Sequence, residues 1–266
     1  MSALIVIPAR YASSRYPGKP LVELEGADGQ KRSLIHRSWL AAKQVEGADR
    51  VVVATDDSRI AEASEAFGAE VVMTPDSCRN GTERCAVVAK GLGADYDIII
   101  NLQGDAPLTP PWFVTELIRS FYENPTRQVV TPVLRCDADA LAGFLEDRKN
   151  GRVGGTTAVF DRAGRALYFS KEVVPYTGRE LAAEEEIPVF HHVGVYGYRQ
   201  AALASYGALT PGPLEFWEGL EQLRFMENGI DVHCVEVEAR GHAFWELNNP
   251  SDVIRIERIL RELGVS

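Results

Sequence analysis

The sequence lacks any apolar run near the roughly 18 residues that a membrane-spanning helix requires. It also lacks a signal-type segment, because its first apolar run is short, follows no charged leader and continues into a polar motif without a cleavage site. Both absences argue against insertion into a membrane. We therefore expect a cytoplasmic protein.

Cysteine is scarce, and its pattern excludes several kinds of site. The chain has 4 cysteines, Cys78, Cys85, Cys136 and Cys234, which form neither a CxxC pair nor a run with the spacing of metal ligands. A zinc site is therefore not expected, and we interpret the thiols as reduced and mostly structural. The chain also shows no Ser/His/Asp nucleophile elbow and no catalytic cysteine motif.

Positive charge is in deficit over the chain as a whole. Lysine and arginine number 28 against 38 aspartates and glutamates, which gives a formal net charge of −10 at pH 7. This balance disfavours a nucleic-acid partner and makes any local cluster of cations informative. Hydrophobic residues make up 45% of the 266 residues, enough for a sizeable core. There is no repeat of fixed period and no low-complexity segment, so one domain fits better than two.

A cluster of cations follows the first apolar run of the chain. Residues 4–7 form a short unbroken apolar run typical of a central parallel strand, and Pro8 ends it. Three cations, Arg10, Arg15 and Lys19, are then interleaved with the small residues Ala12, Ser13, Ser14 and Gly18. Because small residues let a backbone approach an anion, we interpret this loop as a phosphate cradle at the carboxyl end of a strand. A solvated basic loop is the alternative.

Apolar runs and helical patterns alternate as far as residue 134. The expected strands are 51–55, 70–73, 96–102 and 129–134, and the expected helices are 33–45, 58–67, 81–92 and 110–123. Ser33 is the expected N-cap of the first helix. Charged or amide side chains follow three of the strands, which is what a nucleotide site on a doubly wound sheet requires. We therefore predict an α/β fold with a doubly wound, mostly parallel sheet.

The alternation stops after residue 135. The elements expected there are an irregular excursion over 136–155, a hairpin of 156–160 and 166–169, a mobile surface loop over 177–188, a strand over 191–199, a helix over 214–228, a strand over 231–237 and a helix over 251–263. The apolar residues at threefold spacing in the longer helix should pack inward. These residues are Leu214, Trp217, Leu220 and Leu223. We expect a lobe over the sheet from about 136 to 230, and a return to the core over about 231–266.

Residues 103–105, Gln-Gly-Asp, follow the apolar run 98–102 directly. If that strand is a parallel neighbour of the first, Asp105 lies opposite the cationic loop at the same edge of the sheet. A carboxylate there can hold Mg²⁺, a hard cation that takes a few protein oxygens together with substrate phosphates. The alternative is an aspartate that caps a helix, but the prolines that follow delay the next helix and favour the metal role.

The segment 80–84, Asn-Gly-Thr-Glu-Arg, opens the predicted helix 81–92. Gly81 permits close backbone contact, and Arg84 can form charge-assisted hydrogen bonds. An ordinary helix start explains the same residues equally well at this point.

The run Ile-Pro-Ala-Arg-Tyr-Ala-Ser-Ser-Arg-Tyr-Pro-Gly-Lys-Pro-Leu at residues 7–21 resembles the opening motif of the CMP-Kdo synthetases, the 3-deoxy-manno-octulosonate cytidylyltransferases. The resemblance continues at intervals to about residue 260. It implies a Rossmann-like fold of the nucleotide-diphospho-sugar transferase type, as one domain over 1–266. It also implies a mainly CTP-binding half at about 1–135, an inserted sugar-binding and dimerisation lobe at about 136–230, and a homodimer.

The resemblance also implies roles for residues of the nucleotide half. In the family, the Gln-Gly-Asp holds the catalytic magnesium, and the Gly-Thr-Asp/Glu-Arg segment approaches the cytidine base and phosphates. The residues assigned to CTP binding are Ala9, Arg10, Ser13, Arg15, Lys19, Thr55, Asp56, Asn80, Gly81, Thr82, Arg84 and Gln103. Those assigned to catalysis are Arg10, Lys19 and Asp105. Ala106 stands where the family commonly has glutamate, which leaves the metal assignment intact.

Three later stretches carry the resemblance on the acceptor side. They are Ala-Leu-Tyr-Phe-Ser-Lys at 166–171, His-His-Val-Gly-Val-Tyr-Gly-Tyr at 191–198, and Leu-Glu at 214–215 with Leu-Glu-Gln-Leu-Arg at 220–224. The family histidine equivalent to His192 faces the acid sugar. The implied sugar-binding residues are Tyr168, Ser170, His192, Tyr196, Glu215, Glu221 and Gln222. Taken alone, the aromatic residues and the histidine would be ordinary core residues, and the glutamates a solvated helix face.

Two departures from the family lie where the metal or the acid sugar would be. Family members carry Val-Asp-Thr-Pro-Glu-Asp-Leu, whose first aspartate is a second metal ligand, and this chain has Leu-Asn-Asn-Pro-Ser-Asp-Val at 247–253. Asn248 therefore stands at the ligand position, and its amide oxygen brings no negative charge. Either the metal binds more weakly or Glu246 supplies the missing carboxylate. Thr157 stands where the family often has lysine, so the exact sugar stays open.

We expect an enzyme that transfers CMP from CTP to an acidic 3-deoxy-2-ulosonic sugar, Kdo or a close relative, with Mg²⁺ as cofactor and release of pyrophosphate. A displacement at the α-phosphorus depends on positioning and charge neutralisation and needs no protein nucleophile. Two alternatives stay open. One is transfer to a modified ulosonate or a phosphonate, and the other is a nucleotide-binding regulator without turnover.

Overall fold

The computed structural model describes residues 1–12, 16–92, 95–153, 155–178, 185–242, 245–247 and 249–265. Its described residues contain a ten-stranded sheet in the order β5-β4-β1-β6-β11-β7-β10-β8-β9, with β12 also paired to β7. The strands are β1 (Ala3–Ala9), β4 (Arg50–Thr55), β5 (Glu70–Met73), β6 (Ile98–Leu102), β7 (Val129–Arg135), β8 (Thr156–Phe160), β9 (Ala166–Ser170), β10 (Phe190–His192), β11 (Val195–Arg199) and β12 (Val232–Val237). A separate hairpin consists of β2 (Glu23–Glu25) and β3 (Lys31–Ser33).

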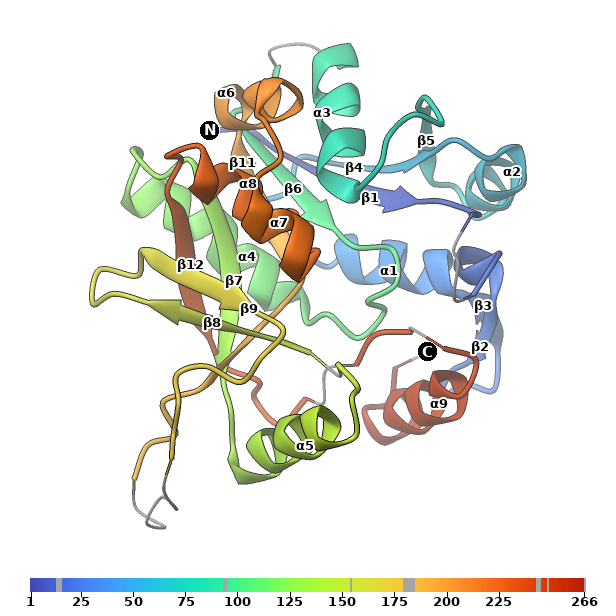
Figure 1. Ribbon diagram of the computed structural model, residues 1–266. Coiled ribbons are helices and arrows are strands. Elements are labelled where there is room, and N and C mark those ends of the chain that lie inside the picture. The colour runs from blue at the N-terminus through green and yellow to red at the C-terminus, as the bar shows by residue number, and fades with distance from the viewer. Residues whose placement is uncertain are drawn as a thin grey trace.

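Helices cover both faces of the sheet (Figure 1). They are α1 (Leu34–Ala42), α2 (Ser58–Ala66), α3 (Gly81–Gly91), α4 (Pro111–Glu123), α5 (Ala138–Lys149), α6 (Gln200–Ser205), α7 (Pro213–Glu218), α8 (Leu223–Glu227) and α9 (Asp252–Glu262). Strand β1 is buried throughout, and its alternate side chains enter two different cores. Leu4 and Val6 pack with α3, α6 and α8, whereas Ile5 and Ile7 pack with α1, α2 and α4. This three-layer arrangement confirms the predicted α/β class.

The amino-terminal part of the sheet is parallel. Strand β1 pairs in parallel with β4 and with β6, and β4 pairs in parallel with β5. The carboxyl ends of β1, β4 and β6 therefore lie at one edge of the sheet. This arrangement places the segment after Ala9 next to the segment after Leu102, as the sequence predicted.

The rest of the sheet is mixed. Strand β11 runs antiparallel to β6 and β7, β12 runs parallel to β7, and the strands β10, β8 and β9 extend from the other end of β7. The single strand expected over 191–199 is wrong, because the chain changes neighbours within it. Its first part, β10, pairs with β7 and β8, and its second part, β11, crosses to β6.

Two predicted elements of the lobe need correction. Helix α5 occupies most of 136–155, where an irregular excursion was expected, and the Asp137 carboxylate caps it by accepting from the Ala140 N–H at 2.7 Å. Phe144 is the only buried residue of this helix, so it lacks the apolar stripe that identifies a helix in a sequence. The surface loop predicted over 177–188 is described only at 177–178 and 185–188, which form no helix or strand.

The long helix expected over 214–228 is also wrong. It is divided into α7 and α8, because Gly219 takes a left-handed conformation with φ of +61° and ends α7. Trp217 is consequently 80% exposed and Leu214 is 40% exposed, so neither packs inward as predicted. Leu223 does, and is fully buried.

The carboxyl-terminal helix α9 packs on the β2–β3 hairpin rather than on the main sheet. Leu24 of the hairpin and Leu34 share a small apolar core with Ile256 and Leu260 of the helix, and with Leu247. The segment before α9 thereby returns to the carboxyl edge of the main sheet. The hairpin was not predicted, because its strands lie in a polar segment, whereas the Ser33 cap of α1 is confirmed.

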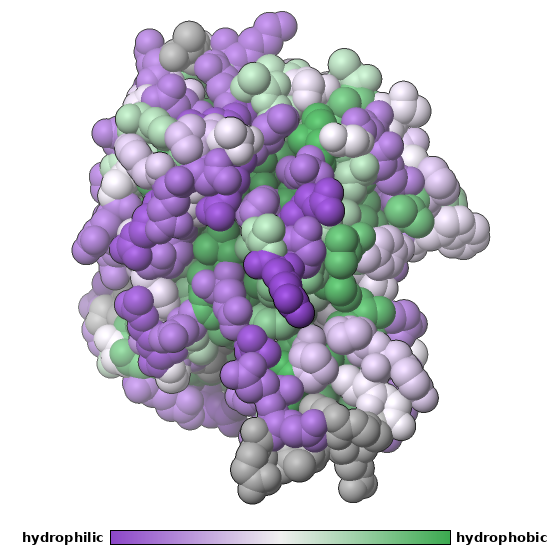
Figure 2. Space-filling model, turned by 90° about the vertical axis from the view of Figure 1, so that its left-hand side faces the viewer, coloured by the Kyte–Doolittle hydropathy of each residue, from purple (hydrophilic) through white to green (hydrophobic). Residues whose placement is uncertain are grey.

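Hydrophilic side chains dominate the face on the side of β12 and the β8–β9 hairpin, with apolar ones showing between them (Figure 2). In the part of the chain that the structure describes, no helix has both the length and the apolar character needed to cross a membrane.

Gly197 gives a stability test of the tight packing between the sheet and α4. A Cβ at this position would lie 2.8 Å from Val130 Cγ2 and 2.9 Å from Phe121 Cε2, both in the buried core. We expect Gly197→Ala to lower the free energy of unfolding by about 1–3 kcal/mol through overpacking. Gly207→Ala is the matched control, because a Cβ there meets nothing within 4 Å. Urea unfolding measures both, and equal stability of the two variants would contradict this description of the core.

Candidate active site

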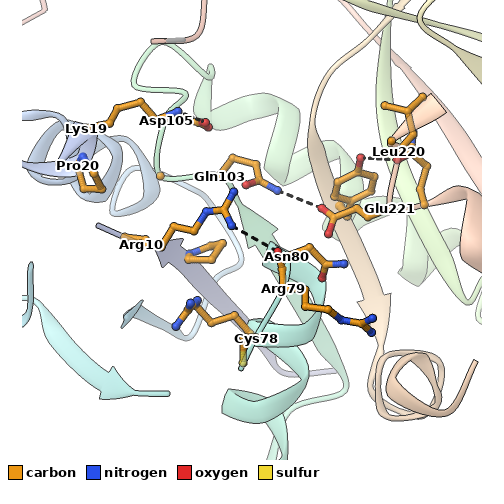
Figure 3. Close-up of a pocket in the computed structure, with 18 residues that line it drawn as sticks. Arg10, Lys19, Pro20, Cys78, Arg79, Asn80, Gln103, Asp105, Leu220 and Glu221 are labelled. Atoms are coloured by element: carbon orange, nitrogen blue, oxygen red, sulfur yellow. Dashed lines mark hydrogen bonds and ion pairs between the residues drawn. The ribbon is translucent and has the colours of Figure 1, made fainter. Parts of the chain in front are cut away.

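A cavity of about 410 Å³ opens at the carboxyl ends of β1 and β6. Its walls come from the end of β1, the turn at Lys19, the start of α3, the segment after β6, strand β11 and the α7–α8 connection (Figure 3). The lining residues are Pro8, Ala9, Arg10, Lys19, Pro20, Cys78, Arg79, Asn80, Gly81, Arg84, Gln103, Gly104, Asp105, Tyr196, Gly219, Leu220, Glu221 and Gln222. Eleven of them are predicted site residues, so segments far apart in the sequence meet here.

Lys19 and Asp105 form an ion pair in this cavity, with Lys19 Nζ 2.6 Å from Asp105 Oδ2. Their side chains are 14% and 29% exposed, so both remain accessible from the cavity. Gly18, with φ of +72°, turns the chain so that Lys19 can open a short 3-10 helix. The predicted opposition of cationic loop and aspartate is therefore present as a direct contact.

Arg10 is a second predicted cation at the cavity. Arg10 lines the cavity, and its Nη1 donates one long hydrogen bond of 3.5 Å to the carbonyl of Arg79. Within the described residues this is the hydrogen bond that the guanidinium makes, which leaves other N–H groups to face an anion. Ser13 and Arg15 lie outside the described residues.

The N-terminus of α3 opens on the cavity. Asn80 caps the helix, its Oδ1 accepting from the Glu83 N–H at 2.8 Å. A Cβ on Gly81 would lie 3.1 Å from the amide nitrogens of both Asn101 and Gln103, so a larger residue would have to displace these side chains. Both amide atoms of Asn101 are buried without a hydrogen-bond partner in the described part of the chain. Backbone N–H groups at the start of this eleven-residue helix favour a negatively charged ligand.

Arg84 is buried beneath the cavity and paired with a predicted site residue. Its Nη2 donates to Asp56 Oδ2 at 3.0 Å, and its Nη1 donates to Thr74. Thr55 is fully buried, and its hydroxyl accepts from the Asp57 N–H. Neither Thr55 nor Asp56 is among the lining residues, so Asp56 reaches the cavity through Arg84.

Glu221 joins the nucleotide half of the cavity to the lobe. Its carboxylate accepts from Gln103 Nε2 at 3.4 Å and from the Thr82 N–H at 3.2 Å. Burial raises the pKa of Glu221. Thr82 does not line the cavity, because its hydroxyl bonds the Tyr198 phenol at 2.8 Å in the core.

Tyr196 and Gln222 form the wall opposite Lys19. The Tyr196 phenol donates to Gln222 Oε1 at 3.0 Å, and Gln222 is 1% exposed. The Gln222 amide nitrogen is buried without a hydrogen-bond partner in the described part of the chain. An unsatisfied buried donor in a cavity wall is costly, and a ligand that supplies an acceptor would remove this cost.

Four predicted sugar-binding residues do not line the cavity, and Tyr168, Ser170 and Glu215 are three of them. Tyr168 and Ser170 both donate to Glu218, at 3.2 and 2.7 Å. Glu215 forms an ion pair with the buried Arg224, whose Nε donates to it at 2.7 Å. These contacts support the wall from behind, so direct contact of the three with a sugar stays a prediction that this geometry does not favour.

His192 is likewise buried behind the wall. Its Nε2 and Nδ1 each lie 3.0 Å from a threonine hydroxyl, that of Thr131 and that of Thr156. Burial lowers the pKa of His192 to about 3 and that of His191 to about 4, so both rings are neutral near pH 7. With both of its nitrogens engaged, His192 would have to change partners before it could contact a sugar.

Because His191 and His192 are buried in the neutral form, we predict that the protein loses stability in mild acid. Their folded pKa values lie below the ordinary 6.5, so the unfolded chain takes up their protons first. We expect full stability above pH 6.5 and a decline as the pH falls from 6.5 toward 4. Urea unfolding of the parent and of His192→Gln between pH 7.5 and 5 measures this, and the variant should show a shallower decline. Equal slopes for the two proteins would contradict the burial of a neutral His192.

The segment before α9 lies against Asp105. The Leu247 N–H donates to the Asp105 carbonyl at 3.0 Å, and the Leu247 side chain is fully buried in the α9 core. The Glu246 side chain lies beside Gly194, with its Oε1 3.5 Å from where a Cβ on Gly194 would stand. Glu246 also raises the pKa of Tyr196, after burial and Glu221. Asn248, the other doubtful metal ligand, lies outside the described residues.

A metal held here would be bound by few protein groups. Among the described residues, no three or more of His, Cys, Asp and Glu are grouped so as to hold a metal ion. Asp105 offers a carboxylate in the cavity, with Glu246 on the adjoining segment. This donor chemistry fits a hard cation that takes most of its ligands from phosphate and water, and does not fit zinc.

Several residues that line the cavity were not predicted from the sequence. Cys78 and Arg79 line the cavity directly before the predicted segment 80–84, and Gly219 and Leu220 line it beside Glu221. Only their nearness to recognised motifs could have indicated them.

The chain is similar to known cytidylyltransferases over most or nearly all of its length. A family model described as cytidylyltransferase matches residues 4–232. A 3-deoxy-manno-octulosonate cytidylyltransferase of Maricaulis maris (strain MCS10) is 45% identical over 264 residues, 99% of each chain. A mitochondrial 3-deoxy-manno-octulosonate cytidylyltransferase of Arabidopsis thaliana is 37% identical, over 98% of this chain and 84% of that one.

The solved structure of a CMP:2-keto-3-deoxy-manno-octonic acid synthetase complexed with CTP superposes with a TM-score of 0.83. It is 33% identical and covers 99% of this chain and 100% of its own. A 4-diphosphocytidyl-2C-methyl-D-erythritol synthase from Anaerococcus prevotii DSM 20548, at 11% identity and a TM-score of 0.61, shares the fold alone. Sequence motifs, sheet topology and full-length similarity thus agree, and the chain belongs to the 3-deoxy-manno-octulosonate cytidylyltransferase family.

Proposed function

We propose that this protein transfers CMP from CTP to the anomeric hydroxyl of 3-deoxy-manno-octulosonate, releasing pyrophosphate. The observation that carries the proposal is one cavity with two chemically different ends. Arg10, Lys19 and the start of α3 suit a triphosphate at one end, and Tyr196 and Gln222 suit a hydroxylated sugar at the other. The names of the full-length relatives and the CTP bound to the structural relative support both substrates.

The proposed reaction requires the protein to position CTP and the sugar, and it requires no protein nucleophile. The bond from the anomeric oxygen to the α-phosphorus forms, the bond from that phosphorus to the β-phosphate oxygen breaks, and the hydroxyl proton passes to solvent. Arg10 and Lys19 would neutralise the triphosphate, and the positive end of the α3 dipole would favour its negative charge. Preorganised donors of this kind lower the barrier because charge moves onto the departing pyrophosphate.

We propose Mg²⁺ as the cofactor, with Asp105 as its protein ligand. When bound, the ion would neutralise charge on the α-phosphate and polarise the phosphorus. Lys19, whose ammonium lies in the same cavity as Asp105, would bind the triphosphate. Glu246 is the candidate for a second carboxylate, because Leu247 holds its segment against Asp105. Asn248 is the alternative candidate.

We place the sugar against Tyr196, Glu221 and Gln222, the three predicted sugar-binding residues that line the cavity. Assignment of about 1–135 to CTP and about 136–230 to the sugar and a dimer contact remains part of the proposal, as does a cytoplasmic location. Sedimentation equilibrium at micromolar concentration distinguishes the proposed homodimer from a monomer.

The test is pyrophosphate release by the purified protein with CTP and Mg²⁺. The panel of acceptors contains 3-deoxy-manno-octulosonate, an amino-substituted ulosonate and a phosphonate, and we expect the highest kcat/KM with the first. A higher value with another acid would replace the acceptor and keep the reaction class. Calorimetric binding of CTP without pyrophosphate release from any acceptor would refute the proposal and favour a nucleotide-binding regulator.

A further inference from the structure

Glu218 directly precedes Gly219–Gln222, the part of the cavity wall that we call the acceptor wall. Its carboxylate accepts hydrogen bonds from three donors at the end of β9. Its Oε1 accepts from the Ser170 hydroxyl at 2.7 Å and from the Tyr168 phenol at 3.2 Å. Its Oε2 accepts from the Lys171 backbone N–H at 2.8 Å. One carboxylate therefore ties the end of β9 to the end of α7.

The position of Glu218 determines where the acceptor wall runs. It is the last residue of α7, and Gly219 follows it in the left-handed conformation. Gly219 to Gln222 then line the cavity in succession. A shift of Glu218 would therefore displace the wall that carries Glu221 and Gln222.

The same carboxylate controls a cation at the edge of the wall. Lys171 Nζ lies 3.0 Å from where a Cβ on Gly219 would stand, so the ammonium rests against the cavity-lining segment. Within the described ranges, this ammonium has no ion-pair partner. Because Glu218 holds the Lys171 backbone, it limits where the ammonium can reach.

We propose that Glu218 is a positioning residue for the acid sugar: by bonding Tyr168, Ser170 and the Lys171 backbone, it holds the Lys171 ammonium and the Gly219–Gln222 wall in the geometry that receives the sugar. An ammonium next to a carboxyl-bearing acceptor supplies charge complementarity, and the Gln222 amide supplies a donor for an acceptor oxygen. This inference rests on the proposed function, since it concerns the acceptor of that reaction.

The decisive variant is Glu218→Gln, which keeps the shape of the side chain and removes one of its two acceptor oxygens. The amide nitrogen of the variant would face a donor, so β9 and α7 should separate slightly. A misplacement of about 1 Å can cost on the order of a hundredfold. We expect the KM for the sugar to rise on the order of tenfold or more, while the KM for CTP and the melting temperature stay near the parent values.

Further variants show whether the effect is specific to the contacts of Glu218. Glu62→Gln, at an exposed position of α2, is the matched control and should behave like the parent. Ser170→Ala removes one of the donors, and in combination with Glu218→Gln its effect should be less than additive, because both act through one contact. Glu218→Asp keeps the carboxylate and should restore part of the affinity for the sugar. If Glu218→Gln lowers the melting temperature, the KM for the sugar is measured instead with Tyr168→Phe, which removes only one hydrogen bond to Glu218.

The outcomes separate the two proposals. If the parent releases pyrophosphate but Glu218→Gln and Ser170→Ala leave the sugar KM unchanged, Glu218 has no positioning role. Equal increases in the KM for CTP and for the sugar would also overturn the inference, since they indicate general structural damage. A parent protein that releases no pyrophosphate with any acid refutes the proposed function itself, and with it the role of Glu218.

Discussion

Asp105→Asn should reduce turnover on the order of a hundredfold, with little change in stability. The carboxylate is the one that faces Lys19 in the cavity at 2.6 Å, and the proposed metal depends on its charge. Loss of a preorganised electrostatic contact in an active site typically costs about 10²–10³-fold in turnover. Asparagine keeps the shape of the side chain and an oxygen that can accept from Lys19, so folding should survive.

The measurement is the rate of pyrophosphate release across a Mg²⁺ titration, together with thermal unfolding. A rise in the Mg²⁺ concentration for half-maximal rate would accompany the loss of turnover. Asp139→Asn, on the exposed start of α5, is the control and should match the parent. Near-parent turnover of a folded Asp105→Asn variant at every Mg²⁺ concentration would show that the metal assignment is wrong.

Lys19→Ala should likewise lower turnover on the order of a hundredfold, but for a different reason. Its ammonium is the cation held at the cavity by the left-handed Gly18 and the short helix that follows. Removal of this charge takes away neutralisation of the triphosphate, and it leaves Asp105 without its partner in the free protein. The free Asp105 should bind a metal more readily, so the Mg²⁺ requirement should fall while the KM for CTP rises.

This opposite response to Mg²⁺ distinguishes Lys19→Ala from Asp105→Asn. Steady-state kinetics at several CTP and Mg²⁺ concentrations measure both effects, and Lys43→Ala, at an exposed lysine after α1, serves as the control. If Lys19→Ala retained near-parent turnover and CTP affinity, the loop after β1 would be only a solvated basic loop. If both variants shifted the Mg²⁺ requirement in the same direction, Lys19 and Asp105 would not bind different ligands, the triphosphate and the metal.

Local pattern predicted most of the nucleotide half. The apolar run 4–7 and the pattern around 98–102 identify buried strands, because a strand covered on both faces needs apolar side chains throughout. Once the two strands are neighbours in parallel, Lys19 and Asp105 must lie at the same edge, although 86 residues separate them. The part of the site that follows from strand order was therefore predictable.

The acceptor side was predicted less well, because its residues act through contacts between distant segments. The assignment of Tyr168 and Ser170 rested on resemblance, and both turn to Glu218 about fifty residues later in the chain. Trp217 has the spacing of an inward residue, but the break at Gly219 leaves it in solvent. Helical periodicity holds only while the helix continues, and local spacing does not show where tertiary contacts end it.

By itself, the sequence determined the elements with strong local signals. These are the unbroken apolar strands, the helix started by Ser33 and the helix started by Asn80, since burial pattern and capping depend on residues a few positions apart. The tertiary structure decided which of the recognised side chains reach the cavity. His192 is hydrogen-bonded to two threonines and Glu215 is paired with Arg224, whereas Glu221 and Gln222 line the cavity. A buried polar group must find a partner wherever the fold supplies one, and that choice depends on residues brought together only when the chain has folded.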